Sequence, residues 1–214
     1  MKFIFLTLYW IISAQATTPG PATEQRTTTR PASIKDAKRI VFLIDSQIHY
    51  LVNFPKMRDE LCSAVNNLRS DQFFTIIVLR PHPPLYFHEN FVRADRLAKS
   101  EARDFILTLQ PEDKIQPSLG IRRVKELNPD LLCLIVGDKF PQEPAIAESL
   151  RSFHGRLNVT IFSSYMPHPN EFLRSLALEH GGTAVDQLGR PIPAPQPPNR
   201  VPVPTTKPSV FEQQ

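Results

Sequence analysis

Short apolar runs alternate along the chain with segments whose apolar residues recur every three or four positions. The runs Arg39–Asp45, Phe73–Leu79 and 131–136 are almost continuously apolar, which is typical of strands buried on both faces. Shorter runs predict three further strands, at 85–87, 159–162 and 183–186.

The segments between these runs predict five helices, because their apolar residues fall on one face at helical spacing. They are expected at 54–68, 100–109, 117–127, 143–153 and 169–180. Pro55 suits a first helical turn, and Gly181-Gly182 is a typical helix end. Strands that alternate with helices predict an α/β fold, doubly wound, with a mostly parallel central sheet and helices on both faces.

The flanks lack this periodicity. Residues 1–16 have the pattern of a signal peptide: Lys2, an apolar run of about ten residues and Ala14-Gln15-Ala16. A short N-terminal anchor is the alternative, although a membrane span needs ~20 apolar residues. We therefore expect export, to the medium, the periplasm or the cell surface, with no membrane span in the mature chain.

Two segments of biased composition flank the periodic region. Residues 17–37 are rich in Thr and Pro, and residues 188–214 hold many of the 22 prolines. Such compositions cannot bury a core and predict disorder. The globular domain is therefore expected at 38–187.

Charge and cysteine content narrow the possible functions. The formal net charge is +4, but Lys2, residues 17–33 and residues 191–214 each contribute one positive charge. The domain is left nearly neutral, which argues against a nucleic-acid partner. An exported protein with Cys62 and Cys133 could form a disulfide, but both cysteines lie in apolar periodic segments, where free cysteine is a common core residue.

Four stretches carry a family resemblance: Ile40–Ile44 running into Asp45, FPKMRDELCSAVNNL, PSLGIRRVKELNPDLLCLIVGDKFP and EFLRSLALEHGGTAV. In order and spacing they resemble a von Willebrand factor A (VWA) domain over about residues 38–187, especially the small versions found in exported bacterial proteins. The resemblance implies the doubly wound fold described above.

The resemblance also implies a position for a metal-ion-dependent adhesion site, at the carboxyl ends of the strands. The family's first motif is Asp-x-Ser-x-Ser, whose hydroxyl and carboxylate oxygens suit Mg²⁺. The matching stretch here keeps Asp45 but has Gln47 and His49 at the serine positions. Ser46, the neighbouring residue, should point elsewhere.

The two other motifs of that site also differ. The family's threonine falls near Ile115 or Gln116, and its Thr-Asp-Gly reads Val136-Gly137-Asp138. The resemblance thus implies a degenerate site without a cofactor, with a divalent cation as the alternative, at Asp45, Gln47, His49, Ile115, Gly137 and Asp138. A strand-end carboxylate such as Asp45 often only closes a turn or caps a helix.

A second set of residues at the strand ends suggests different chemistry. Three histidines and one aspartate each follow a predicted strand, and such groups suit Zn²⁺ better than Mg²⁺. They are His49, His82, Asp138 and His168. An exported zinc-dependent hydrolase is therefore the alternative function.

No catalytic signature accompanies these residues. The sequence lacks a G-x-S-x-G elbow, a phosphate-binding loop and H-E-x-x-H, and Glu112-Asp113 is interpreted as solvated turn charge. We therefore expect a non-catalytic interaction or adhesion-type module whose partner is a protein or a surface polymer. A scaffold role in which the flanking segments do the binding fits the sequence equally well.

Overall fold

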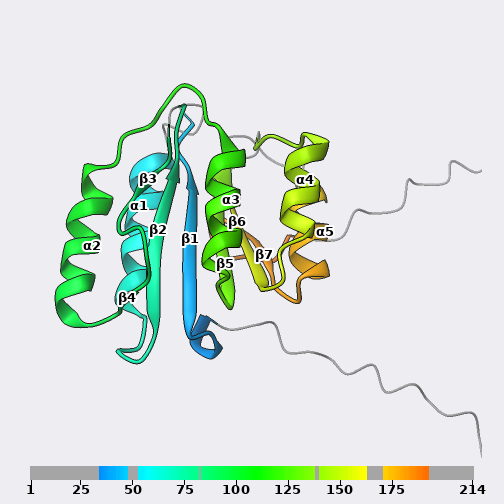
Figure 1. Ribbon diagram of the computed structural model, residues 1–214. Coiled ribbons are helices and arrows are strands. Elements are labelled where there is room, and N and C mark those ends of the chain that lie inside the picture. The colour runs from blue at the N-terminus through cyan, green and yellow to red at the C-terminus, as the bar shows by residue number, and fades with distance from the viewer. Residues whose placement is uncertain (1–33, 48–52, 82, 138–139, 163–170, 193–214) are drawn as a thin grey trace, which may run out of the picture.

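The computed structural model describes residues 34–47, 53–81, 83–137, 140–162 and 171–192 (Figure 1). Strands within these residues form one sheet: β1 (Arg39–Asp45), β2 (Phe73–Leu79), β3 (Leu85–Tyr86), β4 (Val92–Arg93), β5 (Leu131–Gly137), β6 (Arg156–Phe162) and β7 (Ala184–Asp186). The helices are η1 (Ile34–Asp36, a 3-10 helix), α1 (Phe54–Asn66), α2 (Arg96–Thr108), α3 (Pro117–Leu127), α4 (Pro144–Arg151) and α5 (Glu171–Glu179).

The sheet is mostly parallel, as the sequence predicts. Its order is β3-β2-β1-β5-β6-β7, and β4 pairs with β2 beside β3. The strands β1, β2, β5, β6 and β7 run parallel, whereas β3 and β4 run antiparallel to β2. The chain therefore winds outward from β1 in both directions, which is the predicted doubly wound topology.

Helices cover both faces of the sheet (Figure 1). Side chains of α1 and α2 form one buried cluster with Ile40, Phe42 and Ile44. Side chains of α3, α4 and α5 form a second cluster with Val41 and Leu43 on the opposite face. Successive β1 residues thus enter opposite clusters, because side chains alternate between the faces of a strand.

The sequence does not predict η1, which lies in the stretch 17–37 expected to be disordered, or the two-residue strand β4. Two further elements begin earlier than predicted, for identifiable reasons. Helix α2 begins at Arg96 rather than at residue 100, because the Asp95 carboxylate accepts a hydrogen bond of 2.9 Å from the Ala98 N–H and caps the helix. Strand β6 begins at Arg156 rather than at residue 159. Its buried positions alternate with partly exposed ones, so the sequence there has no continuous apolar run.

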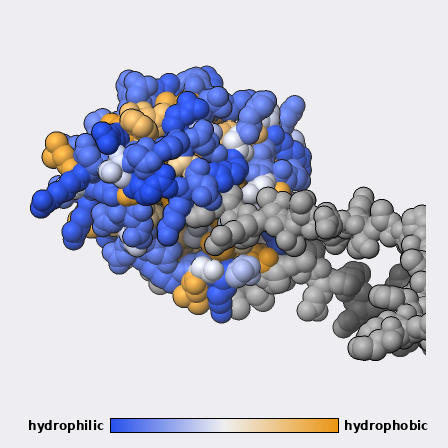
Figure 2. All heavy atoms as spheres, turned by 90° about the horizontal axis from the view of Figure 1, so that it is seen from below, coloured by the Kyte–Doolittle hydropathy of each residue, from blue (hydrophilic) through white to orange (hydrophobic). Residues whose placement is uncertain are grey.

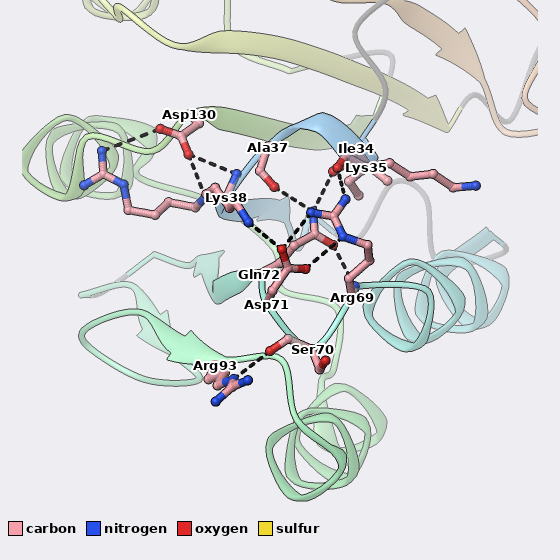
Figure 3. Close-up of polar contacts among 11 residues, drawn as sticks. Ile34, Lys35, Ala37, Lys38, Arg69, Ser70, Asp71, Gln72, Arg93 and Asp130 are labelled. Atoms are coloured by element: carbon pink, nitrogen blue, oxygen red, sulfur yellow. Dashed lines mark hydrogen bonds and ion pairs between the residues drawn. The ribbon is translucent and has the colours of Figure 1, made fainter.

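Polar contacts join several segments at the amino ends of the strands (Figure 3). The Asp130 carboxylate accepts hydrogen bonds from the backbone N–H groups of Lys38 and Arg39, at 3.0 and 2.8 Å. The buried Gln72 amide donates to the carbonyl groups of Ala37 and Ile34, at 2.6 and 2.9 Å. These contacts fix the start of β1 against the segments that precede β5 and β2.

An exposed ion-pair cluster borders the same end of the sheet. Asp71 pairs with Arg69 at 2.8 Å and with Lys38. The Arg69 hydrogen bond, followed by that of Lys38, holds the pKa of the Asp71 carboxyl well below its ordinary value. Figure 2, which views the molecule from below, shows a mostly hydrophilic surface with scattered apolar residues.

Helix α5 ends in two glycines that serve different purposes. Gly181 has φ of 64° and its N–H bonds to the Leu178 carbonyl at 3.0 Å, while the Gly182 N–H bonds to the Ala177 carbonyl at 2.9 Å. This is a Schellman ending with Gly181 in the left-handed conformation. A Cβ atom at Gly182 would lie 1.9 Å from the carbonyl oxygen of Leu157, whereas one at Gly181 would meet nothing within 4 Å.

The two glycines should therefore respond differently to alanine. We expect Gly181→Ala to lower the free energy of unfolding by about 1 kcal/mol, the cost of a left-handed alanine. Gly182→Ala should cost about 3 kcal/mol, because β6 backbone must move to admit the methyl group. Urea unfolding measures both values, and equal losses would contradict the close approach of Gly182 to β6.

Candidate functional site

The strand ends that the sequence singles out lie at one edge of the sheet. Asp45 ends β1 beside Leu79, which ends β2, and Gly137 ends β5 beside Phe162 of β6. The 109–116 segment between α2 and α3 runs over this carboxyl edge (Figure 1). Carboxyl edges of open α/β sheets are the usual place for ligands, so the edge is the candidate site.

Asp45 is fully buried at this edge, with 0% of its surface exposed. Its Oδ1 atom accepts a hydrogen bond of 2.9 Å from the backbone N–H of Gln47. An aspartate that bonds to the N–H two residues ahead closes a local turn. The carboxylate therefore shapes the chain as it leaves β1, which is the structural role considered from the sequence.

Ser46 turns its hydroxyl into the protein. The side chain is 0% exposed, and its Oγ atom donates to the Leu79 carbonyl at the end of β2. Its own carbonyl accepts from the Glu112 N–H, and Gln47 forms a parallel bridge with Glu112. Residues 46 and 47 thus bind the overlying 109–116 segment through the backbone.

An ion pair also holds the 109–116 segment over the carboxyl edge. The Arg80 Nε atom lies 2.8 Å from Glu112 Oε1, with side chains that are 38% and 29% exposed. The Arg80 carbonyl also accepts from the Gln116 N–H at 2.9 Å. Arg80 therefore holds the 109–116 segment at two points over the end of β2.

Glu112 corrects one interpretation made from the sequence. We expected solvated turn charge for Glu112-Asp113, and Asp113 is indeed exposed. Glu112 is instead half-buried and paired with Arg80, 32 positions away in the sequence. Only the return of the chain over the edge brings these two residues together, and no local sequence signal indicates it.

The remaining predicted site residues divide into two groups. Ile115 is partly buried and packs against the cluster under α3 and α5, and Gly137 is buried, with its carbonyl accepting from the Phe140 N–H at 3.3 Å. Four others lie outside the described residues, so their arrangement stays a prediction: His49, His82, Asp138 and His168.

The described residues of the edge fit a hard cation poorly. A Mg²⁺ site needs several oxygen ligands directed at one point. Here the Asp45 carboxylate accepts from Gln47, the Ser46 hydroxyl donates to Leu79, and Ile115 has no side-chain oxygen. Within the described ranges, no three His, Cys, Asp or Glu side chains are grouped closely enough to hold a metal ion.

Both cysteines are free thiols, each half-buried against the cluster under α1 and α2. Burial raises the pKa of the Cys62 thiol, and it raises that of Cys133 to about 12. The thiolate is the reactive form of cysteine, so neither residue is poised as a nucleophile at neutral pH.

The turn role of Asp45 leads to a test by substitution. We expect Asp45→Ala to lower the free energy of unfolding by about 1 kcal/mol, because the half-buried Gln47 N–H loses its acceptor. Asp45→Asn should lose less, since an amide oxygen can accept the same hydrogen bond. Urea unfolding in EDTA and in Mg²⁺ measures both variants, and a loss seen only with Mg²⁺ would assign the carboxylate to the metal instead.

Comparisons with known proteins give a likeness in structure alone. No family model and no curated protein matches the sequence. A von Willebrand factor type A protein from Catenulispora acidiphila superposes with a TM-score of 0.57 at 15% identity, over 70% of this chain. The SpRpn10 VWA domain superposes with a TM-score of 0.50 at 10% identity, over 75% of this chain.

A third similar structure is the pilus adhesin SpaC from Lactobacillus rhamnosus GG in its open conformation, with a TM-score of 0.52 at 9% identity over 73% of this chain. This chain covers 38% of the Catenulispora protein, 28% of SpaC and 90% of the SpRpn10 domain. The described part of the chain therefore has the fold of a von Willebrand factor A domain.

Proposed function

We propose that this protein is an exported, non-catalytic interaction module that binds a protein or a surface polymer without a metal ion. The observation that carries the proposal is the closure of the edge beside Asp45 by the chain itself. Ser46, Gln47 and Arg80 hold the 109–116 segment where an adhesion-type metal site would need open oxygen ligands.

The fold supports an interaction role in a general way. VWA-like neighbours include the pilus adhesin SpaC, and unrelated functions often share one fold. Adhesion is therefore an analogy, and the proposal rests on the contacts at the carboxyl edge of this chain's own sheet. Without a ligand-binding cation, recognition falls to exposed side chains of the 109–116 segment, among them Asp113 and Lys114.

Export and the boundaries of the flanking segments are part of the same proposal. They rest on the signal-peptide pattern of residues 1–16 and on the composition of residues 17–37 and 188–214. No helix in the described part of the chain is long and apolar enough to cross a membrane.

The alternative, a zinc-dependent hydrolase, has no supporting observation among the described residues. It requires His49, His82, Asp138 and His168 to converge, and all four lie outside those residues. The sequence also has no catalytic motif to accompany them.

Thermal melting tests metal independence directly. We expect the melting temperature of the full chain to be the same in EDTA and in excess Mg²⁺, Mn²⁺ or Zn²⁺. A bound ion at ~100 times its dissociation constant would add ~2.7 kcal/mol of stability, which a melting curve resolves easily. The Asp45→Asn variant serves as the matched control.

Either kind of shift would overturn part of the proposal. Stabilisation by Mg²⁺ or Mn²⁺ that Asp45→Asn abolishes would establish an adhesion-type metal site. Stabilisation by Zn²⁺ alone would favour the histidine set and the hydrolase alternative.

A capture experiment tests the edge as the contact surface. The immobilised full chain should retain its partner from surface extracts of the source cells equally well in EDTA and in Mg²⁺. The double variant Asp113→Ala and Lys114→Ala should retain at least about tenfold less, a loss of ~1.4 kcal/mol. Glu101→Ala, on the exposed side of α2, is the control, and equal retention by both variants would place the contact elsewhere.

A further inference from the structure

Among the described residues, one part of the sheet has a helix layer on a single face only. On the face of α1 and α2, the side chains of β1 and β2 are buried, but Asn158 and Thr160 of β6 and Val185 of β7 remain partly exposed. On the opposite face, Val159 and Ala184 are buried beneath α5. The alternation along β6 is the signature of a strand with one covered and one open face.

A hollow of about 220 Å³ lies on this open face, between β5, β6, β7 and α1. Its floor mixes apolar and small polar side chains, among them Cys133, Ile135, Thr160 and Val185. Ile34 and Ala64 also line it. The floor therefore suits small apolar and polar side chains of an extended segment.

The rim of the hollow is acidic on the side of β7. Glu60 of α1 lines it, and burial raises the pKa of the Glu60 carboxyl, a rise that Lys56 opposes and the neighbouring Asp186 reinforces. Both carboxylates already have cationic partners: Lys56 lies 3.8 Å from Glu60, and Arg190 lies 2.7 Å from Asp186. Because the Glu60 pair is the longer of the two, Glu60 is the carboxylate with which a cationic occupant would pair.

The chain's own C-terminal segment starts beside this hollow. After β7 the chain turns back, so that Pro191 bridges Val185 in antiparallel fashion and the Ile192 N–H donates to the Ala184 carbonyl at 3.1 Å. The 22 residues 193–214 follow directly. Neighbouring strands are ~4.8 Å apart, so residues 191–192 lie about one strand spacing from β7, whose Val185 lines the hollow, and about two from β6.

Length and composition both suit the segment to the hollow. An extended proline-rich chain rises ~3.1 Å per residue, so the eight residues from 193 to 200 reach much farther than the hollow requires. Arg200 ends that stretch, and VPVPTTKPSVF follows it, so the segment offers valine and phenylalanine for the floor and Arg200 and Lys207 for the Glu60 carboxylate. Proline lacks an N–H group, so a proline-rich segment cannot continue a full hydrogen-bonded ladder along β7, whereas packing on the open face needs no such ladder.

We propose that the hollow beside α1 is an interaction surface for a basic, proline- and valine-rich segment, and that residues 200–211 of this chain occupy it. Attachment to β7 gives the segment an effective concentration of the order of millimolar, so weak contacts suffice. A partner segment of the same chemistry would have to displace residues 200–211 before it could bind there.

Thiol labelling of the full chain provides the test, because Cys133 lines the hollow and Cys62 does not belong to it. In the test variant, residues 200–211 are replaced by a glycine-serine sequence of equal length. We expect iodoacetamide to label Cys133 about tenfold faster in this variant than in the unaltered chain. This factor assumes that residues 200–211 cover the hollow in about nine-tenths of the unaltered molecules. Cys62, near Arg103 and Asp59, should be labelled at the same rate in both chains and reports any loss of folding.

A cross-linking experiment identifies the occupant independently. In a Cys62→Ser chain that also carries Val203→Cys, mild oxidation should join position 203 to Cys133 within one molecule, about tenfold faster than it joins Gln196→Cys, which is nearer to β7 along the chain but outside residues 200–211. Unchanged labelling of Cys133, or equal cross-linking from positions 196 and 203, would overturn the proposal. A disulfide formed mainly between two molecules would assign the hollow to a second copy and would overturn it as well.

Discussion

The burial of β1 between β2 and β5 is the constraint on which the rest of the structure depends. Its residues from Ile40 to Asp45 are buried, and they alternate between the two core clusters. A strand covered on both faces needs helices on each side of the sheet. The outward winding of the chain from β1, and the meeting of the strand ends at one edge, both follow from that requirement.

The carboxyl edge shows how the same architecture serves different chemistry. Parallel strands always gather their ends at one edge, where open α/β sheets usually bind ligands. In this chain the local hydrogen bonds of Asp45 and Ser46 are directed at Gln47 and Leu79. The 109–116 segment then crosses the edge, held by Glu112 and Arg80, so these groups stabilise a closed turn at the end of β1.

The two faces of the sheet differ in how fully helices cover β6 and β7. The face of α3, α4 and α5 is covered across β6 and β7, whereas the face of α1 leaves a hollow over the same strands. The amino end of the sheet is closed by the Asp130 and Gln72 hydrogen bonds and is mostly hydrophilic (Figures 2 and 3). The carboxyl edge and the hollow are therefore the surfaces that stand out for recognition.

Local patterns in the sequence predict most of the helices and strands and the class of fold. The apolar runs at Arg39–Asp45 and Phe73–Leu79 and the helical spacing after Phe54 mark the strands and helices, because burial on one or two faces leaves a direct trace in local pattern. The end of α5 at Gly181 was also predictable, because the left-handed backbone conformation favours glycine.

The surroundings of the candidate site follow from contacts between distant segments. The pairing of Glu112 with Arg80 and the open side of β6 depend on segments that are distant in sequence. Local periodicity reports whether a side chain is buried, but it does not report which distant segment buries it or whether a helix lies above a given strand. That choice is made by the packing of the whole chain.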